Sequence, residues 1–490
     1  MASIRQAIAA SFLSRYASLV VNIVVVMTIS RLLKPEEIGV FSICMVVIGA
    51  AALLRNAGAG EYLIQAKELP PERVRNVFTV LLVTSWTLAL VIFLGRGYVA
   101  EFYRHPEVAD ILLIQTIGFV VVPFGATTFS ILTRRMDFST LAVINLAGAL
   151  MQAVVSIGLA AMGYSFYALA WGSVAGMATP PLVTVLIRWH LVEWRPRFKG
   201  ITQVLSVSLA YQGTNLISYF NINVSELVMG RFLGMAPVAT FNRARSVTQL
   251  FYKLVMEGLI PVAMPAFAEH LRQGEDVRVL FLKGQVLLHV IAWPFFAALF
   301  FMAEPFVLLM FGEQWMASVP IVRVLCLACM VGFVTALANE VVKATGRAGA
   351  LLKMEMALTL LRIAVLIPAA MHSLMALAWV MVASDVVRVT VQVVFLNRII
   401  DLPYHQWVHQ GWRSVPVTLV AAAPAAAMYF TGHMDVATDT PFWELAILVG
   451  LTGAGCGLCW LAAVYLFGHR IRDEINRALA VGGALLRKFT

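Results

Sequence analysis

The sequence is poor in charged residues. Only 13% of its 490 residues are Asp, Glu, Lys or Arg, whereas 61% are hydrophobic. A soluble domain carries roughly 25% charged and about 45–50% apolar residues. So few charges cannot cover the surface of the roughly three soluble domains that this length would suggest. The composition excludes a soluble globular enzyme, a disordered chain and a nucleic-acid-binding module, and it predicts many membrane spans.

Cysteine and catalytic motifs are scarce as well. The five cysteines all lie in apolar runs, so we expect no disulfide framework. The pairs Cys326/Cys329 and Cys456/Cys459 lack the turn that a structural zinc site uses, and we interpret them as packing residues. The chain has no G-x-x-x-x-G-K-[ST], H-E-x-x-H or G-x-S-x-G motif. We therefore predict no catalytic residue, no metal and no cofactor.

What the chain does contain is long apolar runs. A bilayer span needs about 20 mostly apolar residues, and fourteen stretches qualify. They are Ala10–Leu33, Ile38–Leu54, Val77–Tyr98, Val108–Leu132, Leu141–Met162, Ala168–Ile187, Ile201–Phe220, Val238–Val262, Val286–Ala303, Val319–Val342, Ala348–Met371, Leu374–Leu396, Val415–Phe430 and Trp443–Phe467. The predicted fold class is an all-α polytopic membrane protein with fourteen transmembrane helices.

The basic residues predict the orientation of these spans. Of the 36 Lys and Arg residues, 24 fall on one side of the predicted spans, 5 on the other and 7 within them. Because loops rich in Lys and Arg stay in the cytoplasm, we predict that both termini are cytoplasmic. The last stretch, Arg470–Thr490, mixes Leu and Ile with basic residues. It is typical of an amphipathic helix on the inner leaflet, or else of a frayed tail.

An internal repeat suggests how the spans are grouped. Arg31–Phe41 and Arg231–Phe241 match at a constant offset of 200 residues, each at the junction of two spans. Six spans separate the copies, so both copies have the same orientation. We predict an N-terminal six-helix lobe at 1–200, a second six-helix lobe at 201–400, and two extra helices with the tail at 401–490. Parallel repeats of this kind are typical of transporters.

Polar residues within the spans form stripes at helical spacing, and such residues usually face a cavity or one another. We predict a hydrated cationic cavity in which Arg15, Arg245 and Lys253 attract an anionic group. Uncharged side chains would bind hydroxyl groups there, namely Asn215, Tyr219, Asn223 and Gln249. Glu226 and Glu257 are candidates for ion coupling. The alternative is that these stripes only hold helices together.

Other charges within the spans have a simpler interpretation. Asp385 and Arg388 are three residues apart, as are Glu340 and Lys343, and we expect structural ion pairs. Arg323 and Arg362 either line a cavity or reach to a membrane surface. We expect His289 to be a packing residue with its hydrogen bonds satisfied.

Three segments resemble a known family. They are Ser30–Ser42, Asn56–Gln65 and Gly230–Ser246 followed by Ile260–Phe267. The chain resembles the polysaccharide transporter (oligosaccharide flippase, Wzx-like) family of the multidrug/oligosaccharidyl-lipid/polysaccharide exporter superfamily. It departs at Phe241, where the family often has Tyr, and at Ala239, where it often has Gly, which puts the geometry of this loop in doubt.

The resemblance implies a function. It implies two lobes that alternate in access and move an undecaprenyl-pyrophosphate-linked oligosaccharide across the bacterial cytoplasmic membrane for polysaccharide export. The cationic cavity of Arg15, Arg245 and Lys253 would hold the pyrophosphate. The implied partners are the lipid-linked oligosaccharide and membrane lipids, with a polysaccharide polymerase and a chain-length regulator as further candidates and no nucleic acid.

Two other functions stay open from the sequence. One is a multidrug or small-solute antiporter of the same superfamily, although a site for organic cations would favour acidic residues over the basic stripe. The other is a membrane-embedded polysaccharide polymerase or ligase, which the lack of a long outer loop argues against.

Overall fold

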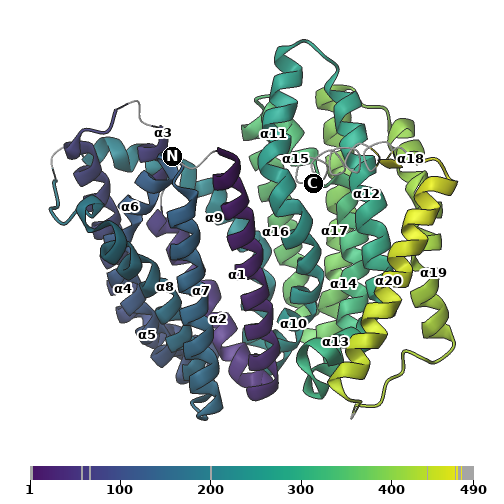
Figure 1. Ribbon diagram of the computed structural model, residues 1–490, viewed down its shortest axis with the longest axis horizontal. Coiled ribbons are helices and arrows are strands. Elements are labelled where there is room, and N and C mark those ends of the chain that lie inside the picture. Colours follow the sequence, from purple (N-terminus) through teal and green to yellow (C-terminus); the bar gives the residue numbers. More distant parts are fainter. Residues whose placement is uncertain are drawn as a thin grey trace, which may run out of the picture. The chain divides into compact units, whose positions relative to one another are not determined.

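Every regular element of the described residues is a helix (Figure 1). The computed structural model describes residues 4–56, 59–65, 68–198, 201–438, 440–469, 471–472 and 476. Almost all of the predicted amphipathic tail Arg470–Thr490 therefore lies outside the described residues. The chain forms two compact units, Met1–Ala239 and Thr240–Thr490. The predicted all-α polytopic fold is confirmed, whereas the lobe limits 1–200, 201–400 and 401–490 stay a prediction.

The first unit is a bundle of long helices. Its elements are α1 (Ile4–Leu32), α2 (Pro35–Asn56), α3 (Ala59–Gln65), α4 (Pro71–Tyr103), α5 (Glu107–Val121), α6 (Pro123–Arg134), α7 (Phe138–Ala161), α8 (Ser165–Arg188), the 3₁₀ turn η1 (Trp189–Leu191) and α9 (Ile201–Phe232). Helix α7 packs against α1 and α8, while α9 packs against α2, α3 and α4. This arrangement brings α2 together with α9, the helix that carries one of the predicted polar stripes.

Helices α5 and α6 form one bent pair. Their axes differ by 52° at Pro123, whose missing N–H leaves the carbonyl of Phe119 without its helical donor. The Ser85 hydroxyl of α4 donates to that carbonyl at 2.5 Å. Gly125 then packs against α8, where an added Cβ would lie 2.7 Å from Pro181 Cα. The bend therefore has a local cause in the sequence, and a neighbouring helix satisfies it.

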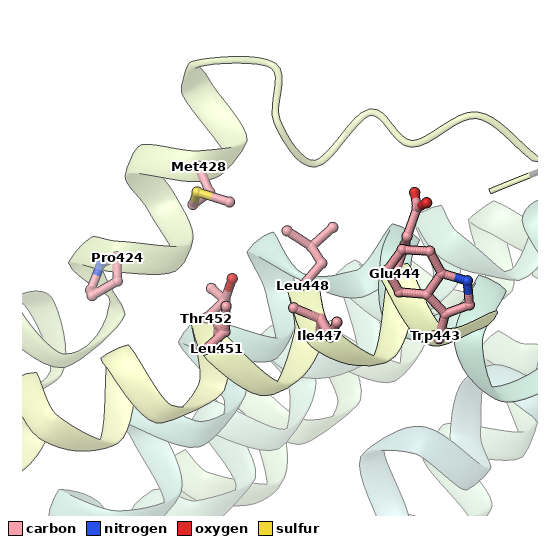
Figure 2. A pocket seen from close by; sticks show the side chains of 8 residues that line it. All are labelled: Pro424, Met428, Trp443, Glu444, Ile447, Leu448, Leu451 and Thr452. Carbon is pink, nitrogen blue, oxygen red and sulfur yellow. The ribbon is translucent and has the colours of Figure 1, made fainter. Parts of the chain in front are cut away.

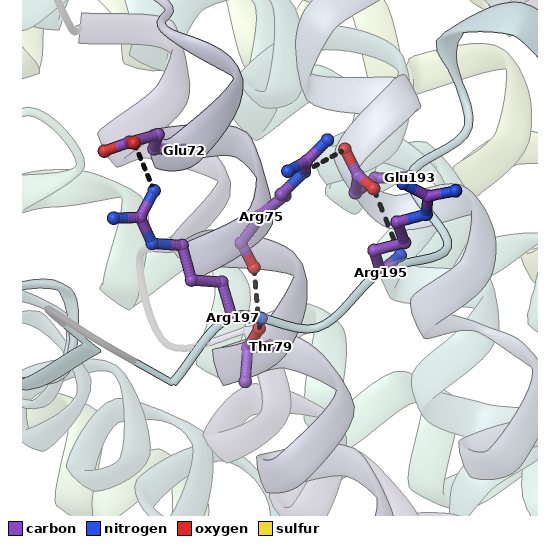
Figure 3. A network of polar contacts seen from close by, with 6 residues as sticks. All are labelled: Glu72, Arg75, Thr79, Glu193, Arg195 and Arg197. Atoms are coloured by element: carbon purple, nitrogen blue, oxygen red, sulfur yellow. Dashed lines mark hydrogen bonds and ion pairs between the residues drawn. The ribbon is translucent and has the colours of Figure 1, made fainter.

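A segment of extended backbone leads from η1 to α9 and is held on α4 (Figure 3). The Arg197 guanidinium pairs with Glu72 at 2.6 Å, and its backbone N–H donates to the Thr79 hydroxyl at 2.7 Å. Arg75 pairs with Glu193 at 3.4 Å. These contacts fix the position from which α9, a predicted site helix, begins.

The second unit contains the remaining helices. They are α10 (Met235–Phe251), which begins in the first unit, then the π-helix η2 (Tyr252–Met256), α11 (Glu257–Arg272), α12 (Val277–Phe301), α13 (Ala303–Phe311), η3 (Glu313–Ser318), α14 (Val319–Gly332), η4 (Phe333–Thr335), α15 (Ala338–Ala344), α16 (Ala348–His372), α17 (Leu374–Ile400), α18 (Tyr404–Trp412), α19 (Ser414–Phe430) and α20 (Phe442–Leu466). Helix α14 packs on α12 and α17, and α12 packs on α19.

Helix α14 is interrupted after Gly332 by the 3₁₀ turn η4. The interruption exposes backbone groups that need partners in a membrane interior. Gln285 of α12 supplies them, because its amide nitrogen donates to Phe333 O at 2.5 Å and its amide oxygen accepts from Leu337 N at 3.3 Å. Trp293, two turns further along α12, donates to Met330 O at 2.9 Å. One face of α12 thus stabilises the break.

Ten helices of the described residues are long and apolar enough to cross a membrane, or eleven if the bent pair α5–α6 is one span. These eleven correspond to eleven of the fourteen predicted spans. The other three predicted spans fall on α9, α16 and α19. Helix α19 is apolar but has only 17 residues, whereas α9 and α16 are long and more polar. The chain is therefore a multi-pass membrane protein.

Candidate functional site

Arg15 lies on α1, two-fifths of the way along the helix, and its side chain is exposed. On the same predicted stripe, the Asn22 amide donates to the carbonyl of Ser18 at 2.9 Å. That bond is internal to α1, so Asn22 does not hold a neighbouring helix. The α1 stripe is thus an open polar face, as a cavity lining requires.

The polar stripe of α9 is used differently. The Tyr219 hydroxyl donates to Val46 O of α2 at 3.0 Å, and the Asn223 amide donates to Tyr219 O at 2.8 Å. Gly49 of α2 makes room for Tyr219, since a Cβ there would lie 2.0 Å from the hydroxyl. Tyr219 and Asn223 therefore take part in the packing of α2 against α9. The side chain of Asn215 lies outside the described residues.

Glu226, one of the two candidate coupling carboxylates, is buried on α9. Glu257, the other, is exposed at the start of α11. The structure therefore places the two carboxylates in contrasting surroundings. Their part in ion coupling stays a prediction.

The stripe of Arg245, Gln249, Lys253 and Glu257 runs along α10, η2 and the start of α11. Arg245 and Gln249 are half-buried, and Lys253 and Glu257 are exposed. In a regular α-helix, residues four apart drift by about 40° around the axis. In η2, however, Glu257 N–H donates to the carbonyl of Tyr252, five residues back, and such a turn rotates less per residue. The π-helix therefore opposes the drift and keeps the stripe near one face.

Charged residues of three helices meet in the interior of the second unit. Arg388 pairs with Asp385 at 3.3 Å on α17, which confirms the predicted ion pair. Arg362 of α16 interacts electrostatically with both, and also with Arg245 of α10. The sequence left Arg362 isolated between two interpretations, and the structure brings it to the same cluster as the predicted site residue Arg245.

Sequence reasoning missed Arg243, two residues before Arg245. Its guanidinium carbon lies 5.2 Å from the centre of the Trp315 ring and 5.6 Å from that of Phe311. These aromatic faces stabilise the cation. The tripeptide Arg-Ala-Arg was the available signal, but a spacing of two puts the residues on different faces of a helix.

Arg323, the other arginine with two interpretations, is held within the second unit. It lies 3.9 Å from Glu304 and over the ring of Tyr429 at 5.0 Å. Glu304 belongs to α13, outside the apolar spans, where burial and the nearby Asp435 raise its pKa and Arg323 opposes the shift. Arg323 is therefore a structural residue of this unit.

His289 and the cysteines have packing roles. The His289 ring stacks on Trp293 with ring centres 4.5 Å apart, and its Nε2 lies 3.2 Å from Phe333 O. The predicted ion pair of Glu340 and Lys343 forms at 2.8 Å. The five cysteines are free thiols. Among the described residues, no three His, Cys, Asp or Glu side chains are placed to hold a metal ion.

Two apolar cavities lie in the second unit. One, of about 600 Å³, borders the stripe helix at Leu250, Leu254 and Val255 and extends to α12 and α20. The other, of about 520 Å³, separates α19 from α20, and Figure 2 shows Pro424 and Met428 on one side with Leu448 and Thr452 on the other. The larger cavity therefore adjoins the face that carries Lys253.

Solved structures show the same fold at low sequence identity. The lipid II flippase MurJ in an inward closed conformation matches with a TM-score of 0.74 and 13% identity, covering 96% of this chain and 99% of that one. An inward-facing MATE family multidrug resistance transporter of the MOP superfamily matches with a TM-score of 0.64 and 15% identity, covering 78% and 94%. These likenesses establish the fold.

Curated relatives are similar over much of the sequence. The succinoglycan biosynthesis transport protein ExoT of Rhizobium meliloti (strain 1021) is 26% identical over 65% of this chain. The lipopolysaccharide biosynthesis protein WzxC of Escherichia coli (strain K12) is 22% identical over 64% of it. The match spans just under two thirds of their own lengths, 64% and 63%. The teichuronic acid biosynthesis protein TuaB of Bacillus subtilis (strain 168) is 24% identical over 85% of this chain and 86% of its own.

A family model supports the same assignment. The model described as "Polysaccharide biosynthesis protein" matches residues 28–320, more than half of the chain. The matched region includes every segment that suggested the resemblance and both copies of the internal repeat. The chain therefore belongs to the polysaccharide biosynthesis protein family, the family of Wzx-like polysaccharide flippases.

Proposed function

We propose that the protein moves a lipid-linked oligosaccharide, carried on an isoprenoid diphosphate, across the bacterial cytoplasmic membrane for polysaccharide export. The relatives are named for the transport or biosynthesis of such polysaccharides. Two six-helix lobes alternate in access around a cationic cavity, and fourteen helices cross the membrane with both termini in the cytoplasm. The protein transports without a catalytic step, and a polymerase and a chain-length regulator act beside it.

The observation that carries this proposal is the two-sided character of the helix formed by α10, η2 and α11. One face presents Arg245 and Lys253. The adjoining face lines the apolar cavity of about 600 Å³ through Leu250 and Leu254. A diphosphate needs compensating charge in a membrane, because burying an unpaired anion is very costly. A lipid tail needs apolar surroundings, so this helix offers both halves of the substrate a suitable contact.

The test is translocation in proteoliposomes. A fluorescent oligosaccharide linked to undecaprenyl diphosphate is placed in one leaflet, and a membrane-impermeant quencher reports how much reaches the other. We expect translocation by the wild type and a loss in Arg245→Ala and Lys253→Ala. Arg272→Ala is the matched control, because Arg272 is an exposed arginine of the same unit.

The other outcomes have distinct meanings. Growth of the sugar chain during the assay would establish a polymerase instead. Proton-driven dye efflux without movement of the lipid-linked sugar would establish a drug antiporter, the alternative that the fold shared with MATE multidrug resistance transporters leaves open. Normal translocation in both alanine variants would remove the role of the basic stripe.

A further inference from the structure

Four charged side chains occupy the middle of three helices in the second unit. Arg362 lies about 21 Å along α16 and Arg388 about 21 Å along α17, at 1.5 Å per residue. Asp385 is one turn before Arg388, and Arg245 lies within the long span Met235–Arg272. All four are therefore at the depth where a charge is most costly.

The cluster carries more positive than negative charge. Asp385 pairs with Arg388, while Arg362 interacts with Asp385, Arg388 and Arg245. Three arginines against one aspartate give a net charge of about +2. The nearest further carboxylate on α16, Glu355, lies two turns before Arg362 and accepts hydrogen bonds from Asn339 and Gln392. It is thus committed to another network.

The two new arginines have hydrogen-bonding capacity to spare. The buried Nε atoms of Arg362 and Arg388 have no hydrogen-bond partner among the described residues. The Arg388 side chain is 35% exposed and that of Asp385 is 20% exposed. Gly332 of α14 leaves space for this guanidinium, since an added Cβ would lie 3.1 Å from Arg388 Nη2. A ligand can therefore reach a guanidinium whose donors are not all used.

Guanidinium groups bind phosphate oxygens through pairs of parallel hydrogen bonds. A diphosphate diester carries two negative charges, which match the excess charge of the cluster. A single carboxylate such as Asp385 satisfies only part of three arginines. The cluster therefore suits a diphosphate better than a monoanion or an uncharged sugar.

We propose that Arg245, Arg362 and Arg388 form a diphosphate subsite in the second unit, and that Asp385 is an internal counter-ion which the ligand displaces from Arg388. The isoprenoid diphosphate identity of the ligand rests on the proposed function. Asp385 holds Arg388 in place and limits the uncompensated charge while the site is empty. When the diphosphate binds, its oxygens replace the carboxylate on Arg388.

The experiment measures the binding of farnesyl diphosphate to the purified full-length protein by calorimetry, with farnesol as the uncharged control. Arg362→Gln and Arg388→Gln should each weaken binding about tenfold or more, since each removes charge-assisted hydrogen bonds. The exposed Arg272→Gln should bind like the wild type. Asp385→Asn should bind more tightly, because it removes a negative charge that competes with the ligand.

A double variant keeps the counter-ion test valid if Asp385→Asn alone does not fold. Asp385→Asn/Arg388→Gln replaces the ion pair by two neutral amides, so no buried charge loses its partner. It should bind farnesyl diphosphate more tightly than Arg388→Gln alone, in which Asp385 repels the ligand. Equal or weaker binding would overturn the counter-ion role. Wild-type binding in both Arg362→Gln and Arg388→Gln would overturn the subsite.

Translocation of the lipid-linked oligosaccharide by the same variants separates this proposal from the proposed function. Diphosphate binding that depends on Arg362 and Arg388 in a protein that moves no lipid-linked sugar leaves the subsite standing and removes the flippase. Translocation that both glutamine variants perform at the wild-type rate leaves the flippase standing and removes the subsite.

Discussion

At the scale of single residues, Asp137 shows how one side chain fixes the start of a span. It precedes α7 and accepts hydrogen bonds from Thr140 N at 3.2 Å and from the Thr140 hydroxyl at 2.8 Å. It also pairs with Arg188 at the end of α8, at 3.3 Å. This N-cap therefore connects the first turn of one helix to the last turn of the next.

The first prediction concerns the pH dependence of this cap. Burial acts to raise the pKa of Asp137, but hydrogen bonds from Thr140, Ser139 and Arg188 outweigh it and hold the pKa below its usual value. The charged form is therefore stabilised by folding, and its contribution is present above the unfolded pKa of about 3.9 and lost as pH falls through the folded pKa. Asp137→Ala should cost about 1 kcal/mol at neutral pH.

The measurement compares the melting temperatures of the wild type and Asp137→Ala from pH 7 down to pH 3. The difference should shrink towards the acid end. Glu101→Ala, at an exposed position of α4, is the control and should follow the wild type throughout. A difference independent of pH would show that the charge of Asp137 does not contribute.

The second prediction concerns Gln285, which satisfies the break in α14. Gln285→Leu keeps the side-chain volume but leaves Phe333 O and Leu337 N short of partners in the interior. An unsatisfied buried group costs about 1–3 kcal/mol, so the melting temperature should fall. Gln273→Leu, at an exposed position of the same unit, should be close to neutral. Equal melting temperatures for the two variants would show that the break does not depend on Gln285.

At the scale of elements, glycines set how closely α2 approaches the α9–α10 turn. An added Cβ on Gly39 would lie 1.9 Å from Met235 O, a backbone atom at the start of α10. Gly230 of α9 similarly faces Ile43, at 2.6 Å from its Cδ1. Gly234, between the two helices, has φ of 96°, a conformation that favours glycine. Both copies of the internal repeat therefore meet at this contact.

The third prediction follows from that approach. Gly39→Ala forces the backbones of α2 and α10 apart, because the clashing atom is not at the end of a flexible side chain. The variant should lose thermal stability and transport, whereas Gly97→Ala should do neither, since Gly97 of α4 has nothing within 4 Å of the added Cβ. The same exchange in a helix is otherwise favourable by about 0.5–1 kcal/mol. A Gly39→Ala protein as stable and active as Gly97→Ala would contradict the close contact.

The sequence predicts elements better than it predicts which of them meet. Apolar length and helical spacing located the spans and the stripe of Arg245 and Lys253. The π-helix at Tyr252–Met256 has no comparable signal, because it depends on how α10 and α11 pack. Arg362 and Arg388 were assigned separately, since nothing in their spacing shows that α16 and α17 bring them together. The hydroxyl of Tyr219 was assigned to a cavity, and only the position of Val46 reveals a packing role.

At the scale of the whole molecule, the distribution of basic residues makes a prediction about topology. The side that holds 24 of the 36 Lys and Arg residues is expected to be cytoplasmic. Arg75, Arg188 and Arg197 of the first unit belong to that side, and each is held there by a carboxylate. The even number of predicted spans then places both termini on this side.

The fourth prediction tests this topology with fusion reporters. A fluorescent protein at either terminus should fluoresce, and alkaline phosphatase at either terminus should be inactive, because both would stay in the cytoplasm. A phosphatase inserted after Lys34 should be active, because we expect that loop on the outer side. Active phosphatase at one terminus alone would mean an odd number of spans and would contradict the fourteen-helix arrangement.

The central claim is that basic residues of the second unit carry a diphosphate-linked sugar across the membrane without changing it chemically. The most direct measurement is the rate at which undecaprenyl-diphosphate-linked oligosaccharide changes leaflet in proteoliposomes that contain the purified protein. We predict translocation of unaltered substrate by the wild type and by Arg272→Ala, with loss in Arg245→Ala and Lys253→Ala. Undiminished translocation in these two variants, or none in the wild type, would contradict the account.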